Sequence, residues 1–442
     1  MWATLRPEVA PECLNQGTSC THRVPGNLAR FRHAPTKPKA ASPARRVSVP
    51  RLPAQGHGAG RVRRSAGAHR QPRSAGKKTV CGGCGCVQSG WYDRKTRRVR
   101  DLSCGDTRVW LELEVRRVDC RRCGKVKTER LDFLAGNPFY TKRFAWYVGR
   151  RCRQSSIREV ARELKLDWHT VKTLECEYMQ AQLDRAGKPA PKVIGVDEIS
   201  IRRGHTYRIV VSDLERKRPI WFGGADRSEA SMAQFYTALG PRKCWAIRMA
   251  VMDMWKPFRA AARAHAPQAA ILFDKFHILR HLGEALDAVR RSEYRRLSGK
   301  DRSYIKGQKY TLLSNAENLS VDGRAALARL LKANKRLNTA YLLKERFSQL
   351  WDYRREAWAR RFFEQWRDSL KWQRLEPFER FAAMIDRHWD AIAAYCHPEN
   401  RVPLGFVEGL NNKIRVIQRR AYGLRDEHYL RLKVLTCMLP EL

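Results

Sequence analysis

The chain has 442 residues, enough for two or three domains, and 43% of them are hydrophobic, as in an ordinary globular protein. Its 88 Lys and Arg residues against 44 Asp and Glu residues give a formal net charge of +44, which exceeds what solubility requires and favours a polyanionic partner such as nucleic acid. No run of about 18 apolar residues could span a bilayer, and no basic-then-apolar signal segment follows Met1, so we expect a cytoplasmic protein with no membrane partner. Thirteen cysteines without an export signal indicate metal binding or free thiols rather than disulfides.

The first 78 residues differ in composition from the rest of the chain. They are rich in Ala, Pro, Gly, Ser and Arg and contain only two acids, Glu8 and Glu12. Because no apolar period runs through them, they cannot bury enough surface to fold alone. We predict a basic, disordered leader over 1–78; a basic arm that binds DNA is the alternative interpretation.

Two matching cysteine motifs follow the leader. The sequences CGGCG, at 81–85, and CRRCG, at 120–124, each place two thiols at Cys-x-x-Cys spacing before a glycine that lets the backbone turn. Two such turns can hold one tetrahedral zinc ion, and the stretch 109–115 between them alternates apolar and polar residues as a half-buried strand does. We therefore predict a structural zinc ribbon over 79–135. The predicted ligands are Cys81, Cys84, Cys120 and Cys123; Cys86 and Cys104 are alternative ligands, and a redox pair is the alternative interpretation.

A helical segment with two helix-start signals occupies 136–185. Apolar residues recur at helical spacing over 157–164, behind a capping box formed by Ser156 and Glu159. After a short break, Asp167 is placed to cap a second helix. This pattern predicts a helix-turn-helix whose second helix presents its first turn to the major groove of DNA, although two helices of an ordinary bundle would look similar. The candidate DNA-binding residues are Trp168, His169, Thr170 and Lys172.

An α/β region begins after the proline-containing linker AGKPAPK, at 186–192. Five strand-like runs and two helical runs give the order three strands, a helix, a strand, a helix and a strand. The predicted strands are Val193–Arg202, Tyr207–Leu214, Pro219–Gly223, Ala246–Met252 and Ala269–Phe273, and the predicted helices are Glu229–Leu239 and Pro257–Ala266. From Ile278 to about Tyr395 only helical periodicity occurs, and most tryptophans of this part are expected in its core.

Carboxylates interrupt the apolar strands at positions where burial makes them costly. Asp197 lies within the strand VIGVDEISIR, Asp253 and Asp274 each end a later strand, and Glu408 lies near the start of a helix. A buried carboxylate needs a partner or a metal ion. The first strand, the neighbouring fourth strand and the late helix can bring Asp197, Asp253 and Glu408 to one sheet edge. Three such acids can hold two magnesium or manganese ions about 4 Å apart for phosphodiester displacement, whereas each acid alone is more typical of a helix cap.

Four runs of the sequence carry a family resemblance. The runs GVDEISIRRGHTYRIVV, VMDMWKPF, AAILFDKFHILRHL and VEGLNNKIRVIQRRAYGLRD resemble the bacterial insertion-sequence L-three family of transposases. The resemblance implies a multidomain α+β protein, in which a zinc ribbon and a helix-turn-helix precede a ribonuclease H-like α/β catalytic domain with an all-helical insertion. The catalytic core would cover 190–277 and 401–442, and the insertion 278–400. The resemblance also implies that Asp197, Asp253 and Glu408 are the catalytic, magnesium-binding Asp-Asp-Glu triad.

Other residues near the predicted triad are secondary candidates. Asp274 is the rival for the second acid, but in the ribonuclease H order that acid ends the fourth strand, so Asp274 and His277 are expected to support the site or contact substrate. Glu198 should point away from Asp197 because side chains alternate along a strand. Asn411 and Asn412 lie one turn beyond Glu408. Four cations further along that helix suit phosphate contacts: Lys413, Arg415, Arg419 and Arg420.

These inferences predict a DNA transposase that binds the terminal inverted repeats of an insertion sequence. The predicted reaction is two-metal strand cleavage and strand transfer without a covalent enzyme intermediate. The expected partner is double-stranded DNA, at the element ends and at the target, bound by a homo-oligomer in the bacterial nucleoid. The alternative is a non-catalytic, sequence-specific DNA-binding regulator derived from a transposase, which the presence of all three acids opposes. A structure-specific nuclease of the same fold is a third interpretation.

Overall fold

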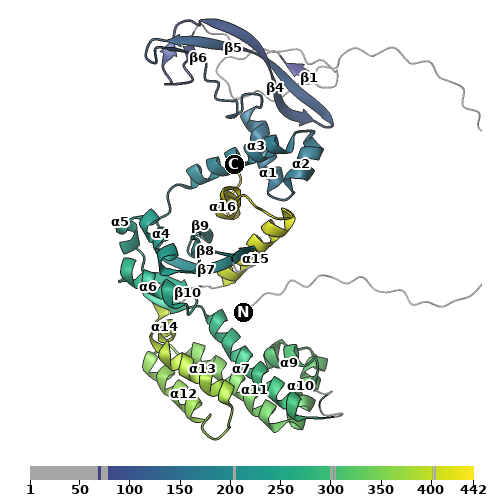
Figure 1. The fold of residues 1–442 in the computed structure, drawn as a ribbon, viewed down its shortest axis with the longest axis vertical. Helices are drawn as coiled ribbons and strands as arrows, with labels where there is room; N and C mark the ends of the chain where they lie inside the picture. Colours follow the sequence, from purple (N-terminus) through teal and green to yellow (C-terminus); the bar gives the residue numbers. More distant parts are fainter. Residues whose placement is uncertain are drawn as a thin grey trace, which may run out of the picture. The chain divides into compact units, whose positions relative to one another are not determined.

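The computed structural model describes residues 68–70, 78–202, 206–298, 302, 305–400, 402 and 405–442 (Figure 1). Most of the predicted leader, 1–67 and 71–77, lies outside the described residues. Strand β1, Ala68–Arg70, pairs in parallel with strand β5, so the prediction of disorder does not hold for these three residues. No helix in the described ranges is long and apolar enough to cross a membrane.

The cysteine motifs lie at one end of a twisted antiparallel hairpin. Strands β4, Asp93–Cys104, and β5, Thr107–Cys120, form the hairpin, and β6, Lys125–Thr128, extends it beside β5. A separate two-stranded ribbon consists of β2, Thr79–Val80, and β3, Val87–Gln88. The predicted alternation is confirmed, because every second residue from Leu111 to Val115 is buried in a small apolar cluster.

Three helices follow, each with a side-chain cap at its start. Helix α1, Lys142–Cys152, is capped by Thr141, α2, Ile157–Leu164, begins with the predicted capping box, and α3, Trp168–Ala186, is capped by Asp167. Gly149 lets α1 and α3 approach closely, since a Cβ atom there would lie 2.3 Å from Cγ of Tyr178. The three helices share one apolar core, as a helix-turn-helix requires.

A five-stranded mixed sheet forms the centre of the α/β region. Its order is β11-β10-β7-β8-β9, in which β7, β8 and β9 are an antiparallel meander and β10 and β11 run parallel to β7. The strands are β7 Val193–Arg202, β8 Thr206–Asp213, β9 Arg218–Gly223, β10 Met249–Met252 and β11 Ala270–Phe273. The predicted fourth strand, Ala246–Met252, began too early: the amides of Ala246 and Ile247 bond back to the Lys243 and Cys244 carbonyls of the short helix α5, Pro241–Trp245, and β10 begins only at Met249.

Different helices cover the two faces of this sheet (Figure 1). Ile194 and Val196 of β7 face helices α4, Glu229–Leu239, and α6, Lys256–His265. Ile199 faces helices α15, Gly405–Arg420, and α16, Glu427–Thr436. Asp197 therefore lies on the α15 face, and Glu198 lies on the opposite face.

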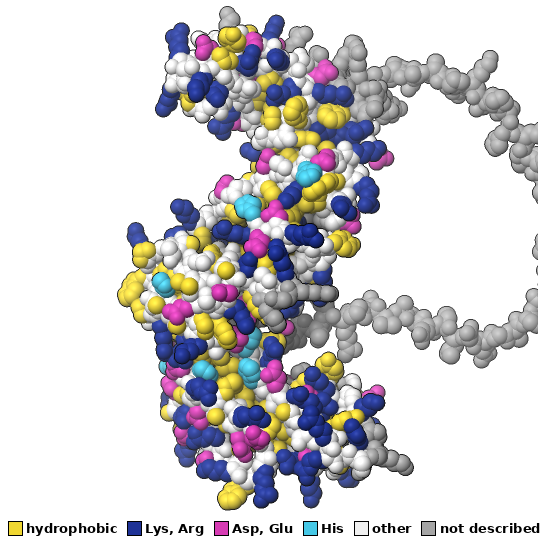
Figure 2. Space-filling view, viewed as in Figure 1, with side chains coloured by type: hydrophobic (Ala, Val, Ile, Leu, Met, Phe, Trp, Pro, Cys, Tyr) yellow, Lys and Arg dark blue, Asp and Glu magenta, His cyan; other side chains and the backbone are white. Residues whose placement is uncertain are grey.

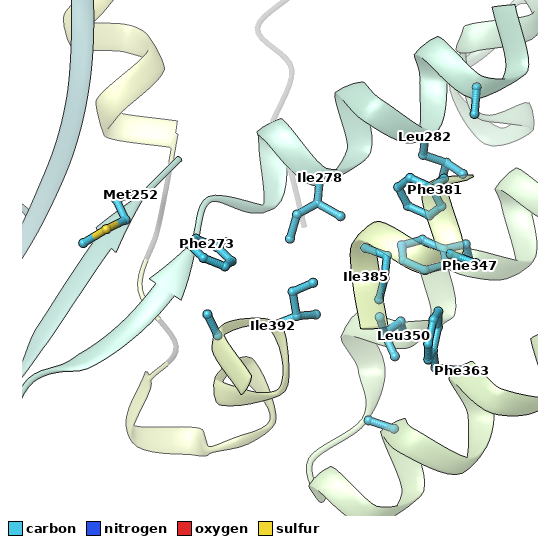
Figure 3. Packing of buried hydrophobic residues seen from close by; sticks show 14 of the residues in the cluster. Met252, Phe273, Ile278, Leu282, Phe347, Leu350, Phe363, Phe381, Ile385 and Ile392 are labelled. Carbon is cyan, nitrogen blue, oxygen red and sulfur yellow. The ribbon is translucent and has the colours of Figure 1, made fainter. Parts of the chain in front are cut away.

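The segment between β11 and α15 contains helices and no strand among its described residues. Its elements are α7 Lys275–Arg296, α9 Lys309–Leu313, η1 Ala316–Asn318, α10 Val321–Ala333, α11 Lys335–Phe347, η2 Ser348–Asp352, α12 Glu356–Asp368, α13 Glu376–Arg387, α14 Trp389–Ala393, η3 Ala394–Cys396 and η4 Pro398–Asn400. Met252 and Phe273 of the sheet belong to the same apolar core as Phe347 and Phe363 of the insertion, and Figure 3 shows some of the side chains that lie between them. The expectation for the tryptophans holds in part: three pack in the core, whereas Trp358 and Trp372 are 55% and 88% exposed.

A buried ionic network joins α3 to α16. The Glu175 carboxylate accepts hydrogen bonds from Lys433 Nζ, at 2.7 Å, and from the Tyr429 hydroxyl. Glu175 is 2% exposed, and burial raises its pKa against the opposing effects of Lys433 and Tyr429. The Lys433 ammonium therefore offsets the free-energy cost of burying the Glu175 carboxylate.

Replacing Lys433 with Met is expected to lower the free energy of unfolding by about 3 to 5 kcal/mol, because it leaves the Glu175 carboxylate buried without its cation. Urea denaturation of the full chain measures the change. The matched control is Lys413→Met, an exposed position on α15, which should change the free energy of unfolding little. Adding Glu175→Gln to Lys433→Met should recover part of the lost stability. A loss no larger than that of the control would contradict this account.

Candidate active site and metal-binding residues

Three aspartates lie side by side at one edge of the sheet. Val196 of β7 is in register with Met252 of β10, and Met252 is in register with Phe273 of β11. The residues that follow these three are Asp197, Asp253 and Asp274, and the Asp274 amide donates to the Met252 carbonyl at 2.8 Å. Because the strands are parallel and the positions are in register, the three carboxyl groups leave the sheet at the same level.

Asp197 is held by its own strand and by α15. One carboxylate oxygen accepts the Glu198 amide at 2.8 Å, and the other accepts the side-chain amide of Asn411. Burial raises the pKa of Asp197, and the hydrogen bonds and the nearby His277 oppose that rise. Within the described residues no Lys or Arg forms an ion pair with this carboxylate, so its position suits a cationic ligand.

Asp253 and Asp274 both contact residues of the first turn of α7. The Asp253 carboxylate accepts the Met254 amide at 2.6 Å and lies 3.5 Å from Nδ1 of His277. Asp274 caps α7 by accepting the Phe276 amide at 2.9 Å. Burial raises the pKa of Asp274, and the negative charges of Asp253 and Glu408 raise it further. A cation between these carboxylates would therefore be favoured electrostatically.

Glu408 is exposed in the first turn of α15 and lines the same pocket as Asp274. Val407 anchors this turn against the sheet, since a Cβ atom on Gly195 would lie only 3.0 Å from its Cγ2 atom. The acids remain apart, however: no three of them within the described residues bring ligand atoms within 4.8 Å of one another. The structure thus gathers Asp197, Asp253, Asp274 and Glu408 in one region, in an open arrangement.

Glu198 belongs to a different group on the opposite face. Its carboxylate pairs with Arg227 at 3.0 Å, as expected for a residue that points away from Asp197. The Arg227 guanidinium lies over the rings of Tyr207 and Trp255, 4.5 and 4.7 Å from their centroids. The sequence analysis did not predict that Arg227 and Trp255 belong to this group. The position of Trp255, two residues after Asp253, was a signal that could have indicated it.

The four predicted cysteine ligands form one cluster. The Sγ atoms of Cys81, Cys84, Cys120 and Cys123 all lie within 4.8 Å of one another. Backbone amides of Cys84 and Gly83 lower the pKa of the Cys81 thiol to about 7. Against the lowering effect of the Cys86 amide, hydrogen bonds to Cys123 and Cys120 raise the pKa of Cys84 to about 12, so the first thiolate of the cluster forms at Cys81. The glycines after each motif, Gly85 and Gly124, have φ of 74° and 62°, as the predicted turns require.

The two alternative ligands lie outside this cluster. Cys86 Sγ accepts a hydrogen bond from Arg122 at 3.6 Å, and Cys104 is exposed at the far end of the hairpin. Four thiolates complete the coordination of a zinc ion and leave no open position, so the chemistry of this donor set fits a structural ion.

Some of the predicted DNA-binding side chains are exposed, and others already contact the protein. Trp168 is 46% exposed, its ring lies 3.5 Å from that of the exposed His169, and Thr170 is half-buried. Lys172 is instead paired with Asp426 at 2.6 Å. On α15, Asn411 is buried against Asp197 and Arg420 donates to the Arg153 carbonyl at 2.6 Å. The remaining candidates on that helix are exposed: Asn412, Lys413, Arg415 and Arg419.

Three parts of the chain match known families. Residues 194–434 match the family described as Transposase, residues 129–174 match the helix-turn-helix domain of transposase family ISL3, and residues 77–123 match the zinc-finger of transposase IS204/IS1001/IS1096/IS1165. The chain is 34% identical over 362 residues to the transposase for insertion sequence element IS1001 of Bordetella parapertussis, which covers 81% of this chain and 88% of that relative. It is 29% identical over 391 residues to the transposase for insertion sequence element IS1557 of Mycobacterium tuberculosis, which covers 81% of this chain and 85% of the relative.

Proposed function

Because the chain belongs to the insertion-sequence L-three (ISL3) family and is a DNA-binding transposase of the Asp-Asp-Glu class, we propose that it cleaves the ends of an insertion sequence and joins them to target DNA. The observation that carries this proposal is the alignment of Asp197 with Asp253 on adjacent parallel strands, beside the helix of Glu408. In the sheet, a three-stranded antiparallel meander is followed on the β7 side by two strands parallel to β7. This order supports a ribonuclease H-like core over 190–277 and 401–442, interrupted by the insertion 278–400.

In this proposal Asp197, Asp253 and Glu408 bind two magnesium or manganese ions. Such ions, when bound, activate water or a 3′ hydroxyl and stabilise the leaving oxygen. The chain's own residues prepare the site: Asn411 orients the Asp197 carboxylate, and His277 and Asp274 border Asp253 from the start of α7. No three acids of the described residues bring their ligand atoms within 4.8 Å of one another, and in this proposal the ions bridge the space between them.

The basic surface and the two N-terminal modules support binding to double-stranded DNA. Figure 2 shows Lys and Arg side chains distributed over the whole visible face. We assign the zinc ribbon to 79–135 and the helix-turn-helix to 136–185, and we infer that both contact the terminal inverted repeats. Two ends must be held together for strand transfer, so the active species is proposed to be a homo-oligomer on bacterial nucleoid DNA.

A plasmid assay tests this function directly. A supercoiled donor plasmid that carries the element between its matching ends is incubated with the full chain and magnesium. Nicks at the repeat ends, excised element or strand-transfer products support the proposal. A mobility shift without any cleavage would favour the DNA-binding regulator, and cleavage that ignores the repeat sequence would favour a structure-specific nuclease.

Replacing His169 with Ala is expected to weaken binding to the repeat by about 5- to 150-fold, because an exposed side chain in the first turn of a recognition helix reads base edges. Competition binding with repeat and scrambled duplexes at fixed salt measures the loss. The matched control is Gln180→Ala, an exposed position further along the same helix. Equal loss on both duplexes would assign His169 to phosphate contact, and no loss would remove it from the interface.

A further inference from the structure

A pocket of about 450 Å³ adjoins the proposed metal-binding acids. Its lining includes the acids Asp274 and Glu408. The other lining residues are Lys275, Phe276, Leu279, Trp351, Tyr395, Val402 and Gly405. We call it the aromatic pocket. Its residues come from the start of α7, from the helical insertion and from the start of α15, so the insertion supplies walls to the site region that the sheet alone cannot provide.

The aromatic walls are held in place by contacts behind them. The Tyr395 hydroxyl donates to the Phe273 carbonyl at 2.8 Å, which ties this ring to the end of β11. The Trp351 ring packs edge to face against Tyr395, with centroids 5.4 Å apart. Phe276, in contrast, leaves 49% of its surface exposed. The pocket therefore has two fixed rings and one exposed ring, against which a flat aromatic ligand can stack.

Lys275 places a cation at the pocket. Its ammonium lies 4.9 Å from the Trp351 ring centroid, and within the described residues no carboxylate forms an ion pair with it. A ligand that matches the rings and this cation offers a ring face and a neighbouring negative charge. A nucleotide of DNA has both.

From this arrangement we propose that the aromatic pocket receives a base extruded from the DNA beside the phosphate that the acids attack. The proposal rests on the function proposed above, since Asp274 and Glu408 border both the pocket and the metal-binding region. Inside a duplex the bases are stacked and paired, so a base must leave the helix to reach such a pocket, and stacking on aromatic side chains offsets that cost. Extrusion at this point would also open the duplex where the scissile phosphate must approach the acids.

The test uses the full chain, duplexes that contain the element end, and abasic sites placed singly at each nucleotide around the cut. Phe276→Ala is expected to slow cleavage of the intact duplex on the order of tenfold, because it removes one stacking surface. An abasic site at one position should restore most of that rate, since no base then has to be extruded. Duplexes that carry a thymine at each position in turn are oxidised with permanganate, with calcium in place of magnesium, and one position should be reactive in a way that Phe276→Ala removes.

Controls separate this proposal from the proposed function. Trp372→Ala removes an exposed aromatic of the insertion that does not line the pocket, and it should leave cleavage unchanged. Asp197→Asn should abolish cleavage of intact and abasic duplexes alike; if it does not, the proposed catalytic site fails whatever the pocket does. A Phe276→Ala variant that cuts intact duplex at the normal rate, or whose defect no abasic position relieves, overturns the pocket proposal alone.

Discussion

Replacing Asp197 with Asn is expected to reduce strand cleavage by at least about 1,000-fold while the protein still binds the element end. The variant keeps the size of the side chain, but its single amide oxygen can accept only one of the two N–H groups that Asp197 accepts, and it loses the charge that would hold a cation. We expect the largest loss of cleavage at Asp197 because its side chain lies between the strand that precedes Asp253 and helix α15. Cleavage of the supercoiled donor plasmid, measured beside a mobility shift of the same DNA, separates catalysis from binding.

The matched control is Glu198→Gln, which changes the adjacent carboxylate on the opposite face of the sheet. Glu198 pairs with Arg227 rather than with the acids of the site, so a much smaller loss is expected. If both variants lost cleavage equally, the charge of Asp197 would have no special role, and its assignment as a metal ligand would be wrong.

Cysteine variants with metal rescue decide between Asp253 and Asp274. A thiolate is softer than a carboxylate and binds manganese better than magnesium. Asp253→Cys is therefore expected to lose magnesium-dependent cleavage and to regain part of it with manganese, whereas Asp274→Cys should show no such rescue because Asp274 chiefly caps α7. Rescue of Asp274→Cys alone would make Asp274 the second acid.

Removal of zinc is expected to unfold the ribbon and to weaken binding to the element end by about 100-fold or more, because a structural zinc site contributes its binding free energy directly to folding. That free energy is about 10 to 16 kcal/mol for small zinc modules, far more than the small apolar cluster of the hairpin can replace. A chelating dye measures one zinc ion released per chain, and limited proteolysis shows whether 78–130 becomes sensitive while the sheet remains protected.

Single cysteine substitutions test the ligand set behind this effect. Cys120→Ser should lower the zinc content and the binding to the repeat, whereas Cys104→Ser, at an exposed position outside the cluster, should change neither. Full zinc content in Cys120→Ser with loss in Cys104→Ser would show that the ligands were assigned wrongly.

Much of this architecture could be predicted from local pattern alone. The paired Cys-x-x-Cys-Gly motifs predict the cluster of four thiols, because tetrahedral zinc requires that donor set and the glycines permit the turns. Ser156 and Asp167 predict the helix starts, because a capping side chain bonds to amides within three residues of itself. The family resemblance is confirmed by the matching families. The early start given to the fourth strand was wrong, because the amides of Ala246 and Ile247 bond back to the helix that precedes β10.

Long-range contacts decided what no local pattern contains. Lys172 was predicted to face DNA, but the fold pairs it with Asp426, 254 residues further along the chain. The exact level at which Asp197, Asp253 and Asp274 leave the sheet depends on strand register, and the contact of Asn411 with Asp197 depends on how α15 packs on β7. The roles of the acids remain predictions. Helix caps and metal motifs depend on residues that are close in sequence. Strand register and helix packing depend instead on the burial of apolar surface from distant segments. Only the tertiary structure could therefore reveal the aromatic pocket beside the acids.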